Sequence, residues 1–169
     1  MAHTVLVVMG SDSDFPVLEP CLKTLTEFGI DWEAVVCSAH RSPERAACLA
    51  REAEGKGVGA IIAAAGLAAH LPGVLASMTV LPVIGIPVKS GALDGMDALL
   101  SIVQMPPGVP VAAVAIDGAV NAAVLAVQVL SAGNPALRDR LQAYKDDLVR
   151  SVDLRDARLR KKIAGEVRP

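Results

Sequence analysis

The chain has 169 residues, of which 53% are hydrophobic and 2% aromatic, and its formal net charge is −2. The length favours a single domain over residues 1–169, with a core in residues 4–132 that Ala, Val, Leu and Ile must fill. The charge excludes an overall basic field that would recruit nucleic acid. No apolar run reaches the roughly 20 residues of a membrane span, and the first apolar run is too short for a secretory signal.

The three cysteines, Cys21, Cys37 and Cys48, lie among apolar residues and have no Cys-x-x-Cys spacing. Such cysteines are typical of reduced thiols rather than of a disulfide framework or a zinc site. We therefore expect three buried, reduced thiols and a cytoplasmic location.

Continuous apolar runs predict strands at residues 4–9, 31–37, 58–64, 81–86 and 111–116. Apolar residues at helical spacing predict helices at residues 15–28, 43–55, 72–78, 94–105 and 118–130, and a last helix that starts near residue 134. Residues 134–169 then form a C-terminal helix and a charged tail. The tail, residues 151–169, is expected to be a frayed or solvated terminus, with a position across a neighbouring subunit as the alternative.

Several residues predict where these elements begin and end. Gly29 is a natural stop for the first helix, and Ser42 followed by Pro43 is a typical start for the second. Asp94 is expected to cap the fourth helix, and residues 87–91 are expected to be a loop.

Strands alternate with helices, and the strands are uninterrupted apolar runs, which indicates a parallel sheet covered on both faces. Right-handed crossovers then give a three-layer, doubly wound α/β fold. We favour the flavodoxin-like strand order 2-1-3-4-5, with an extra C-terminal helix. In such a sheet, ligands bind outside the carboxyl ends of the strands, so the turns there are the candidate site.

The turn after the first strand, residues 10–14, has the composition of an anion site. Gly10 lets the backbone approach a ligand, while Ser11 and Ser13 add hydroxyl donors beside a helix start. Asp14 either caps the helix or accepts hydrogen bonds from ligand hydroxyls. An ordinary strand-to-helix turn is the alternative, because the turn is neither a Walker A motif nor a dinucleotide fingerprint.

The second and third turns add groups for acid–base chemistry and anion binding. His40 follows a strand directly, and histidine ordinarily titrates near neutral pH. Arg41 carries a planar cation suited to phosphate or carboxylate, and Ser38 offers a hydroxyl. His70 is a second polar group in the third turn, with a helix-cap role as its alternative. His3 is expected to be an exposed terminal residue.

Other chemistries have weaker support. Asp12 and Asp14 could hold Mg²⁺, but neither lies at a strand end with a third carboxylate, so we expect no metal. A serine nucleophile lacks its Gly-x-Ser-x-Gly turn, and no cysteine lies in a polar turn. These residues predict a site that uses no cofactor.

Four segments occur in an order and spacing that resemble the class I N5-carboxyaminoimidazole ribonucleotide mutases of bacterial purine biosynthesis: residues 10–14, 38–41, 68–73 and 101–106. The resemblance covers about residues 4–132, and the four segments together are highly specific. It implies an isomerase that moves a carboxylate from an exocyclic nitrogen to ring carbon C4, through CO₂ release and recapture, without a metal or an organic cofactor. It also implies a homo-octamer and a transient hand-off of substrate from N5-carboxyaminoimidazole ribonucleotide synthetase.

The resemblance assigns roles to particular residues. His40 matches the family's proton shuttle, Ser11 and Arg41 match phosphate contacts, and Asp14 matches the residue that accepts from the ribose. By the same resemblance, the base and CO₂ region is lined by Ser38, Ala68, His70 and Leu71.

Two residues depart from the family pattern, because Leu67 and Ala64 stand where glycine is usual. Leu67 either narrows the pocket or packs away from it. Two other functions stay open. One is a class II carboxylase that uses free CO₂, although residues 70–73 at the end of the third turn favour class I. The other is a nucleotide-binding module without catalysis.

Overall fold

The computed structural model describes residues 4–166, and the chain divides into two compact units, residues 1–130 and residues 131–169. The predicted role of His3 lies outside the described residues. Each unit is described below by itself.

The first unit is built on a parallel sheet of five strands in the order β2-β1-β3-β4-β5, as predicted. The strands are β1 Thr4–Met9, β2 Trp32–Val36, β3 Val58–Gly66, β4 Val83–Val88 and β5 Ala112–Ala113. Because β2 forms an edge, its side chains are exposed or half-buried, whereas β1 and β4 are almost wholly buried. The flavodoxin-like order places the carboxyl ends of β1, β2, β3 and β4 side by side.

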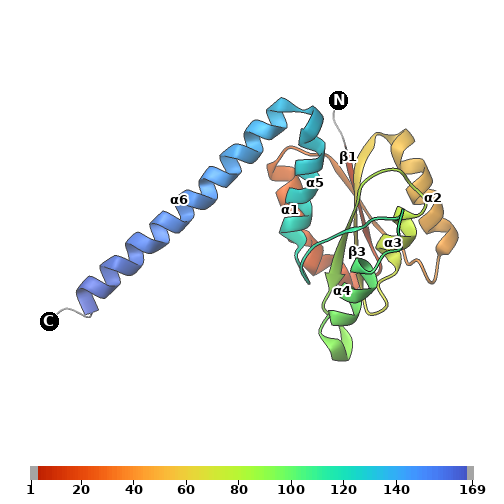
Figure 1. Ribbon diagram of the computed structural model, residues 1–169, viewed down its shortest axis with the longest axis horizontal. Coiled ribbons are helices and arrows are strands. Elements are labelled where there is room, and N and C mark those ends of the chain that lie inside the picture. The colour runs from red at the N-terminus through yellow and green to blue at the C-terminus, as the bar shows by residue number, and fades with distance from the viewer. Residues whose placement is uncertain (1–3, 167–169) are drawn as a thin grey trace. The chain divides into compact units, whose positions relative to one another are not determined.

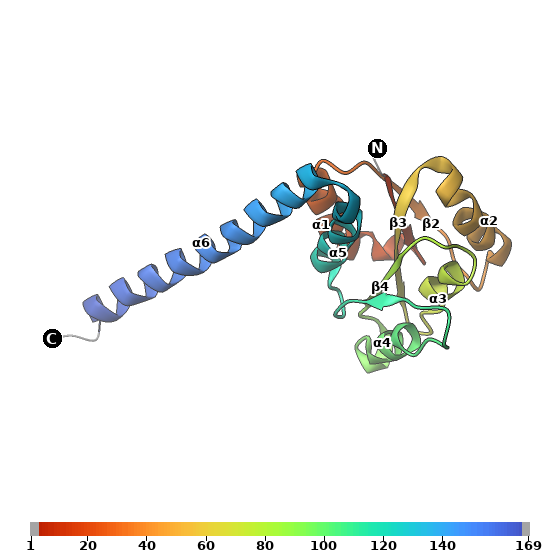
Figure 2. The ribbon, with the colours of Figure 1, turned by 45° about the horizontal axis from the view of Figure 1, so that its top comes forward.

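Helices cover both faces of this sheet. They are α1 Phe15–Glu27, α2 Pro43–Ala53, α3 Leu71–Ala76, α4 Met96–Val103 and α5 Ala119–Leu130, with short 3-10 turns at Asp12–Asp14, Glu54–Lys56 and Gly91–Leu93. Figure 1 shows α1 and α5 together on one face, and α2, α3 and α4 on the other. The turned view in Figure 2 keeps the same two groups apart. The predicted three-layer, doubly wound fold is therefore confirmed.

Small aliphatic side chains fill the core. On the face of α2, α3 and α4, strand residues such as Leu6, Ile61 and Ala63 pack against Ala50, Leu75 and Ile102 of the helices. These side chains are at most 3% exposed. Burial of each large aliphatic side chain stabilises the fold by roughly 1.5–3 kcal/mol. The shortage of aromatic residues is thus met by close packing of many small side chains, as predicted.

Three boundaries differ from the prediction on the β4 side of the sheet. Pro87 and Val88 belong to β4 and not to a loop, because they continue its parallel pairing with β3 opposite Ala65 and Gly66; the carbonyl of Pro87 also accepts from the amide of Asp117 at 2.9 Å. Asp94 does not cap α4; it has φ of 51°, and Gly95 occupies the N-cap position. β5 has two residues instead of six, although the amide of Val114 also bonds to Gly85.

The prediction of three buried thiols is wrong for Cys48. On α2 the buried residues are Ala46, Ala50 and Ala53, and Cys48 lies on the opposite face, where its thiol donates to Glu52 at 2.9 Å. Cys21 and Cys37 are buried, and burial raises the pKa of the Cys21 thiol to about 12. A thiol with so high a pKa is inert at neutral pH.

The second unit consists of a 3-10 turn, Ser131–Gly133, and helix α6, Pro135–Glu166. Asn134 begins the helix, since its side-chain oxygen accepts from the amide of Leu137 at 3.2 Å. The tail after residue 150 is helical and not frayed, because α6 continues to Glu166 with ion pairs such as Arg160–Asp156 one turn apart. Residues 152–165 are exposed in the single chain, which agrees with the alternative of a solvated terminus. Within residues 4–166, no helix is both long and apolar enough to cross a membrane.

Candidate active site

A cavity of about 430 Å³ lies outside the carboxyl ends of β1 to β4. All ten predicted site residues line it: Gly10, Ser11, Ser13, Asp14, Ser38, His40, Arg41, Ala68, His70 and Leu71. The strand order explains this convergence, because four neighbouring strands deliver four turns to one edge of the sheet. Whether each residue contacts a substrate stays a prediction.

The first turn folds on itself through its own polar groups. The Ser11 hydroxyl accepts from the amide of Ser13 at 3.3 Å, and the Asp14 carboxylate accepts from the amide of Ser11 at 3.0 Å. The two bonds form a capping box around the 3-10 turn Asp12–Asp14 and leave Asp14 without a capping bond to α1. The predicted helix-cap role of Asp14 is therefore replaced by a bond that shapes the turn between β1 and α1.

Burial raises the pKa of Asp14 above its ordinary value, the hydrogen bond from Ser11 opposes that shift, and the nearby charge of Asp12 adds to it. The ionised carboxylate is thus poorly solvated until a ligand donates to it. Such a group is suited to bind hydroxyl donors, for instance those of a ribose.

We expect Asp14→Asn to unfold at a higher temperature than the parent at neutral pH. Because the folded chain holds this proton more tightly than the unfolded chain, the parent loses stability as the pH rises through the range of Asp14. The gain should vanish at about pH 3, where the carboxyl is protonated in both states. Thermal denaturation at the two pH values measures this, and a gain that does not depend on pH contradicts it.

The second turn joins Arg41 to the first. The Arg41 guanidinium donates to the carbonyl of Gly10 at 3.3 Å, and the Ser38 hydroxyl accepts from the amide of Arg41 at 3.3 Å. Ser42 stands at the start of α2, but its hydroxyl donates to the carbonyl of Ser38 at 2.9 Å instead of capping the helix. The guanidinium is thereby held beside the serines of the first turn, where an anion would receive donors from both.

The two histidines of the site are bonded to each other. His40 Nε2 lies 2.8 Å from His70 Nδ1, and the rings meet edge to face with centroids 4.9 Å apart. Only one of these facing nitrogens holds a proton in the bond, so the tautomers of the two rings are coupled. A proton can be stored at one ring while the other meets a ligand, which suits general acid–base chemistry.

The third turn carries backbone strain at Leu67. Its φ is 53°, in the left-handed region that an L side chain occupies at a cost of about 1–2 kcal/mol. Two tight bonds follow, from the amide of Ala69 to the carbonyl of Leu67 and from the amide of His70 to that of Ala68. Leu67 lines the cavity, is 55% exposed, and reaches Gly91 with its side chain, so it does not join the core.

We expect Leu67→Gly to leave the free energy of unfolding within about 1 kcal/mol of the parent, although a large side chain is lost. Relief of the left-handed strain offsets the backbone entropy of glycine. Leu67→Val should instead lower it by roughly 1–2 kcal/mol, since a branched Cβ is disfavoured in this region. Urea denaturation compares the two variants, and a glycine variant less stable than the valine variant contradicts the expectation.

Sequence reasoning missed Ser90, which lines the cavity just after the end of β4. Its neighbours in the cavity, Ala39, Ala65 and Gly66, are small or apolar and lie in turns already singled out. The signal for Ser90 was present in the predicted order, because β4 is the next neighbour of β3 and its turn must face the same edge.

The fourth segment of the resemblance, residues 101–106, lies at the end of α4. Ser101, Gln104 and Met105 line a second cavity of about 480 Å³, and His70 borders this cavity as well as the first. Among the described residues, no group of three or more His, Cys, Asp or Glu side chains comes together as a metal site.

This parallel α/β sheet in the order 2-1-3-4-5, with a bonded histidine pair in a cavity at its carboxyl edge, defines a flavodoxin-like protein. The chain belongs to the AIR carboxylase family, whose model matches residues 4–151. It is 57% identical to the N5-carboxyaminoimidazole ribonucleotide mutase of Pyrococcus abyssi, over 85% of this chain and 83% of that protein. It is 55% identical to the mutase of Mycobacterium tuberculosis, over 95% of this chain and 92% of that protein.

A solved structure supports the same assignment. The crystal structure of Treponema denticola PurE matches with a TM-score of 0.84 and 27% identity, over 92% of this chain and 98% of that one. The family predicted from the four sequence segments is therefore confirmed.

Proposed function

We propose that this protein is an isomerase of purine biosynthesis that converts N5-carboxyaminoimidazole ribonucleotide into 4-carboxy-5-aminoimidazole ribonucleotide. The family and the names of the relatives support the reaction. The observation that carries the assignment to these residues is the His40–His70 bond of 2.8 Å in the same cavity as the anion-binding turn.

Binding begins with the ribonucleotide. Ser11, Ser13 and Arg41 offer hydroxyl and guanidinium donors to the phosphate from two turns that are already bonded to each other. Asp14, whose carboxylate lacks full solvation, accepts from the ribose hydroxyls. The imidazole base then extends towards Ser38, Ala68, His70 and Leu71.

The reaction is a balanced exchange of one proton and one CO₂. The bond between the exocyclic nitrogen and the carboxylate carbon breaks, its electron pair stays on nitrogen, and nitrogen takes a proton from the His40 imidazolium. Ring carbon C4 then attacks the released CO₂, and the proton on C4 passes to the neutral imidazole. His40 ends as it began, so the residues need neither an oxidant nor a co-reactant.

The freed CO₂ must stay in place until C4 attacks it. In the single chain His40, Arg41 and His70 are exposed, so closure must come from bound substrate or from other copies. Helix α4 offers a surface for such copies, because Met96, Leu100 and Val103 form an apolar stripe that is about half exposed. This stripe supports the proposed homo-octamer.

The oligomer has a direct test. Native mass spectrometry should give an eight-chain particle for the parent and smaller particles for Leu100→Glu, whose exposed position leaves the fold intact. A fully active single chain would overturn the octamer. We further propose a cytoplasmic location, which the free thiols support, and a transient hand-off of substrate from N5-carboxyaminoimidazole ribonucleotide synthetase.

The reaction is tested by two assays on one preparation. One supplies N5-carboxyaminoimidazole ribonucleotide, and the other supplies aminoimidazole ribonucleotide with bicarbonate. Rapid conversion in the first identifies the mutase. Conversion that depends on bicarbonate identifies a class II carboxylase instead, and nucleotide binding without conversion in either assay identifies a binding module.

A further inference from the structure

The turn after β4 holds the third turn of the site in its strained shape. The Ser90 hydroxyl accepts from the amide of Leu67 at 3.2 Å, and it lies so close to Gly66 that a Cβ there would meet it at 2.4 Å. The Leu67 side chain in turn reaches Gly91, where an added Cβ would lie 2.8 Å from Leu67 Cδ2. The two turns therefore contact each other at three places: Ser90 meets Gly66 and the Leu67 amide, and Gly91 meets the Leu67 side chain.

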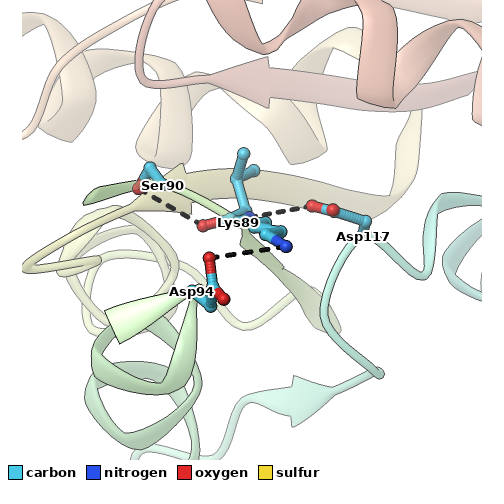
Figure 3. A network of polar contacts seen from close by, with 5 residues as sticks. Lys89, Ser90, Asp94 and Asp117 are labelled. Carbon is cyan, nitrogen blue, oxygen red and sulfur yellow. Dashed lines mark hydrogen bonds and ion pairs between the residues drawn. The ribbon is translucent and has the colours of Figure 1, made fainter. Parts of the chain in front are cut away.

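The Ser90 turn is itself anchored from two sides (Figure 3). The amide of Lys89 donates to the Asp117 carboxylate at 2.9 Å, and the Lys89 ammonium lies 3.4 Å from the Asp94 carboxylate. Asp94 and Asp117 both have left-handed backbones, with φ of 51° and 56°. Non-glycine residues keep such backbones where surrounding contacts hold them, and these contacts fix the position from which Ser90 acts.

We propose that Ser90 is a positioning residue for the reaction: its bond to the Leu67 amide holds residues 66–70 so that His70 stays against His40. Only two residues separate Leu67 from His70, and two tight bonds span this segment, so a displaced Leu67 amide moves the histidine. A shift of about 1 Å in a group that serves the chemistry can cost about 10²-fold in rate. Ser90 acts through the turn and does not need to touch the substrate.

A matched pair of variants tests this role. Ser90→Thr keeps the hydroxyl, whereas Ser90→Val replaces it with a methyl group of similar size, and the extended backbone of Ser90, with φ of −161°, accepts both branched side chains. We expect Ser90→Val to lower kcat by about 10- to 100-fold with KM changed less than about threefold. Ser90→Thr should stay within about threefold of the parent.

A second pair adds no bulk and controls for stability. Thr79 accepts from the amide of Leu81 at 3.2 Å, the same kind and length of bond, but it does not line the site. Ser90→Ala and Thr79→Ala should have similar melting temperatures. Ser90→Ala alone should lose kcat and shift the ¹⁵N resonances of the His40 and His70 rings in NMR spectra.

The outcomes separate this inference from the function on which it rests. A parent that converts neither substrate overturns the proposed function. A converting parent with unchanged kcat and unchanged ring resonances in Ser90→Val and Ser90→Ala overturns the positioning role alone. A loss in Ser90→Thr as large as that in Ser90→Val also overturns it, because the hydroxyl would then be irrelevant.

Discussion

Replacing His40 by asparagine is expected to lower kcat by about 10³-fold, while the Kd for the ribonucleotide changes less than about threefold. Asparagine is polar and can still bond to His70, but it cannot take a proton from C4 and return one to nitrogen. The turns that would donate to the phosphate and accept from the ribose hydroxyls keep their own bonds. Calorimetric titration with 4-carboxy-5-aminoimidazole ribonucleotide measures binding, and the mutase assay measures turnover.

His70→Asn is the matched control for this experiment. It removes the other imidazole ring of the same 2.8 Å hydrogen bond by the same histidine-to-asparagine substitution. We expect a smaller loss than in His40→Asn, because His70 then sets the tautomer and place of His40 without carrying the transferred proton. If His70→Asn has the larger loss, the transfer role passes to His70; unchanged turnover in His40→Asn removes His40 from the mechanism.

Arg41→Met is expected to weaken binding of the ribonucleotide by about 10- to 100-fold, with a smaller effect on kcat. A hydrogen bond between charged partners contributes roughly 1.5–3 kcal/mol, which corresponds to this range. The guanidinium lies against Gly10 and beside the first turn, where the phosphate would sit. Arg41→Lys should recover part of the affinity, since it keeps the charge but loses the planar fork.

Arg51→Met is the control, because it removes the same charge from helix α2, which follows the Arg41 turn, at a position outside the cavity, where Arg51 contacts Met78. Calorimetry at two salt concentrations then separates a direct contact from the general field. Equal losses in Arg51→Met and Arg41→Met contradict the assignment of Arg41 to the phosphate.

Much of the fold could be predicted because local signals and burial agree. The first strand and first helix are found within a residue of their predicted limits, and Gly29 ends the helix with φ of 65°, as a glycine there should. The strand order follows from uninterrupted apolar runs joined by helices. Each of these features depends on neighbours in sequence or on a simple pattern.

The errors arise where distant contacts decide. Proline is common in loops, yet it lacks only the amide hydrogen-bond donor, and the carbonyl of Pro87 still accepts a hydrogen bond from the amide of Asp117. Asp94 is of a residue type that often caps helices, but the cap position of α4 is occupied by Gly95. Gly95 packs so closely against Ile116 and Lys89 that an added Cβ would lie 2.8 and 3.2 Å from them. Cys48 has apolar neighbours in sequence, but the helical period turns it to the outside.

The candidate site was predictable to the level of its turns. Ser11, His40 and His70 line one cavity, as the predicted convergence of three turns required. The bond between the two histidines could not be predicted, since it joins residues 30 positions apart. The place of His70 also depends on the left-handed backbone of Leu67, which no sequence pattern indicates. The predicted strand order already placed the turn after β4 at this edge, but Ser90 itself was missed, because no motif marks a hydroxyl that bonds to a distant backbone amide.

β3 ends beneath the site in the smallest side chains that a strand can offer. Ala63 and Ala64 are fully buried, and Ala65 and Gly66 border the cavity beside Gly10. This side of the cavity is thus formed by a strand whose position the whole sheet fixes. Ala65 borders the cavity and also belongs to the buried core, so a larger side chain there would have to displace core neighbours, and this position should tolerate little beyond alanine.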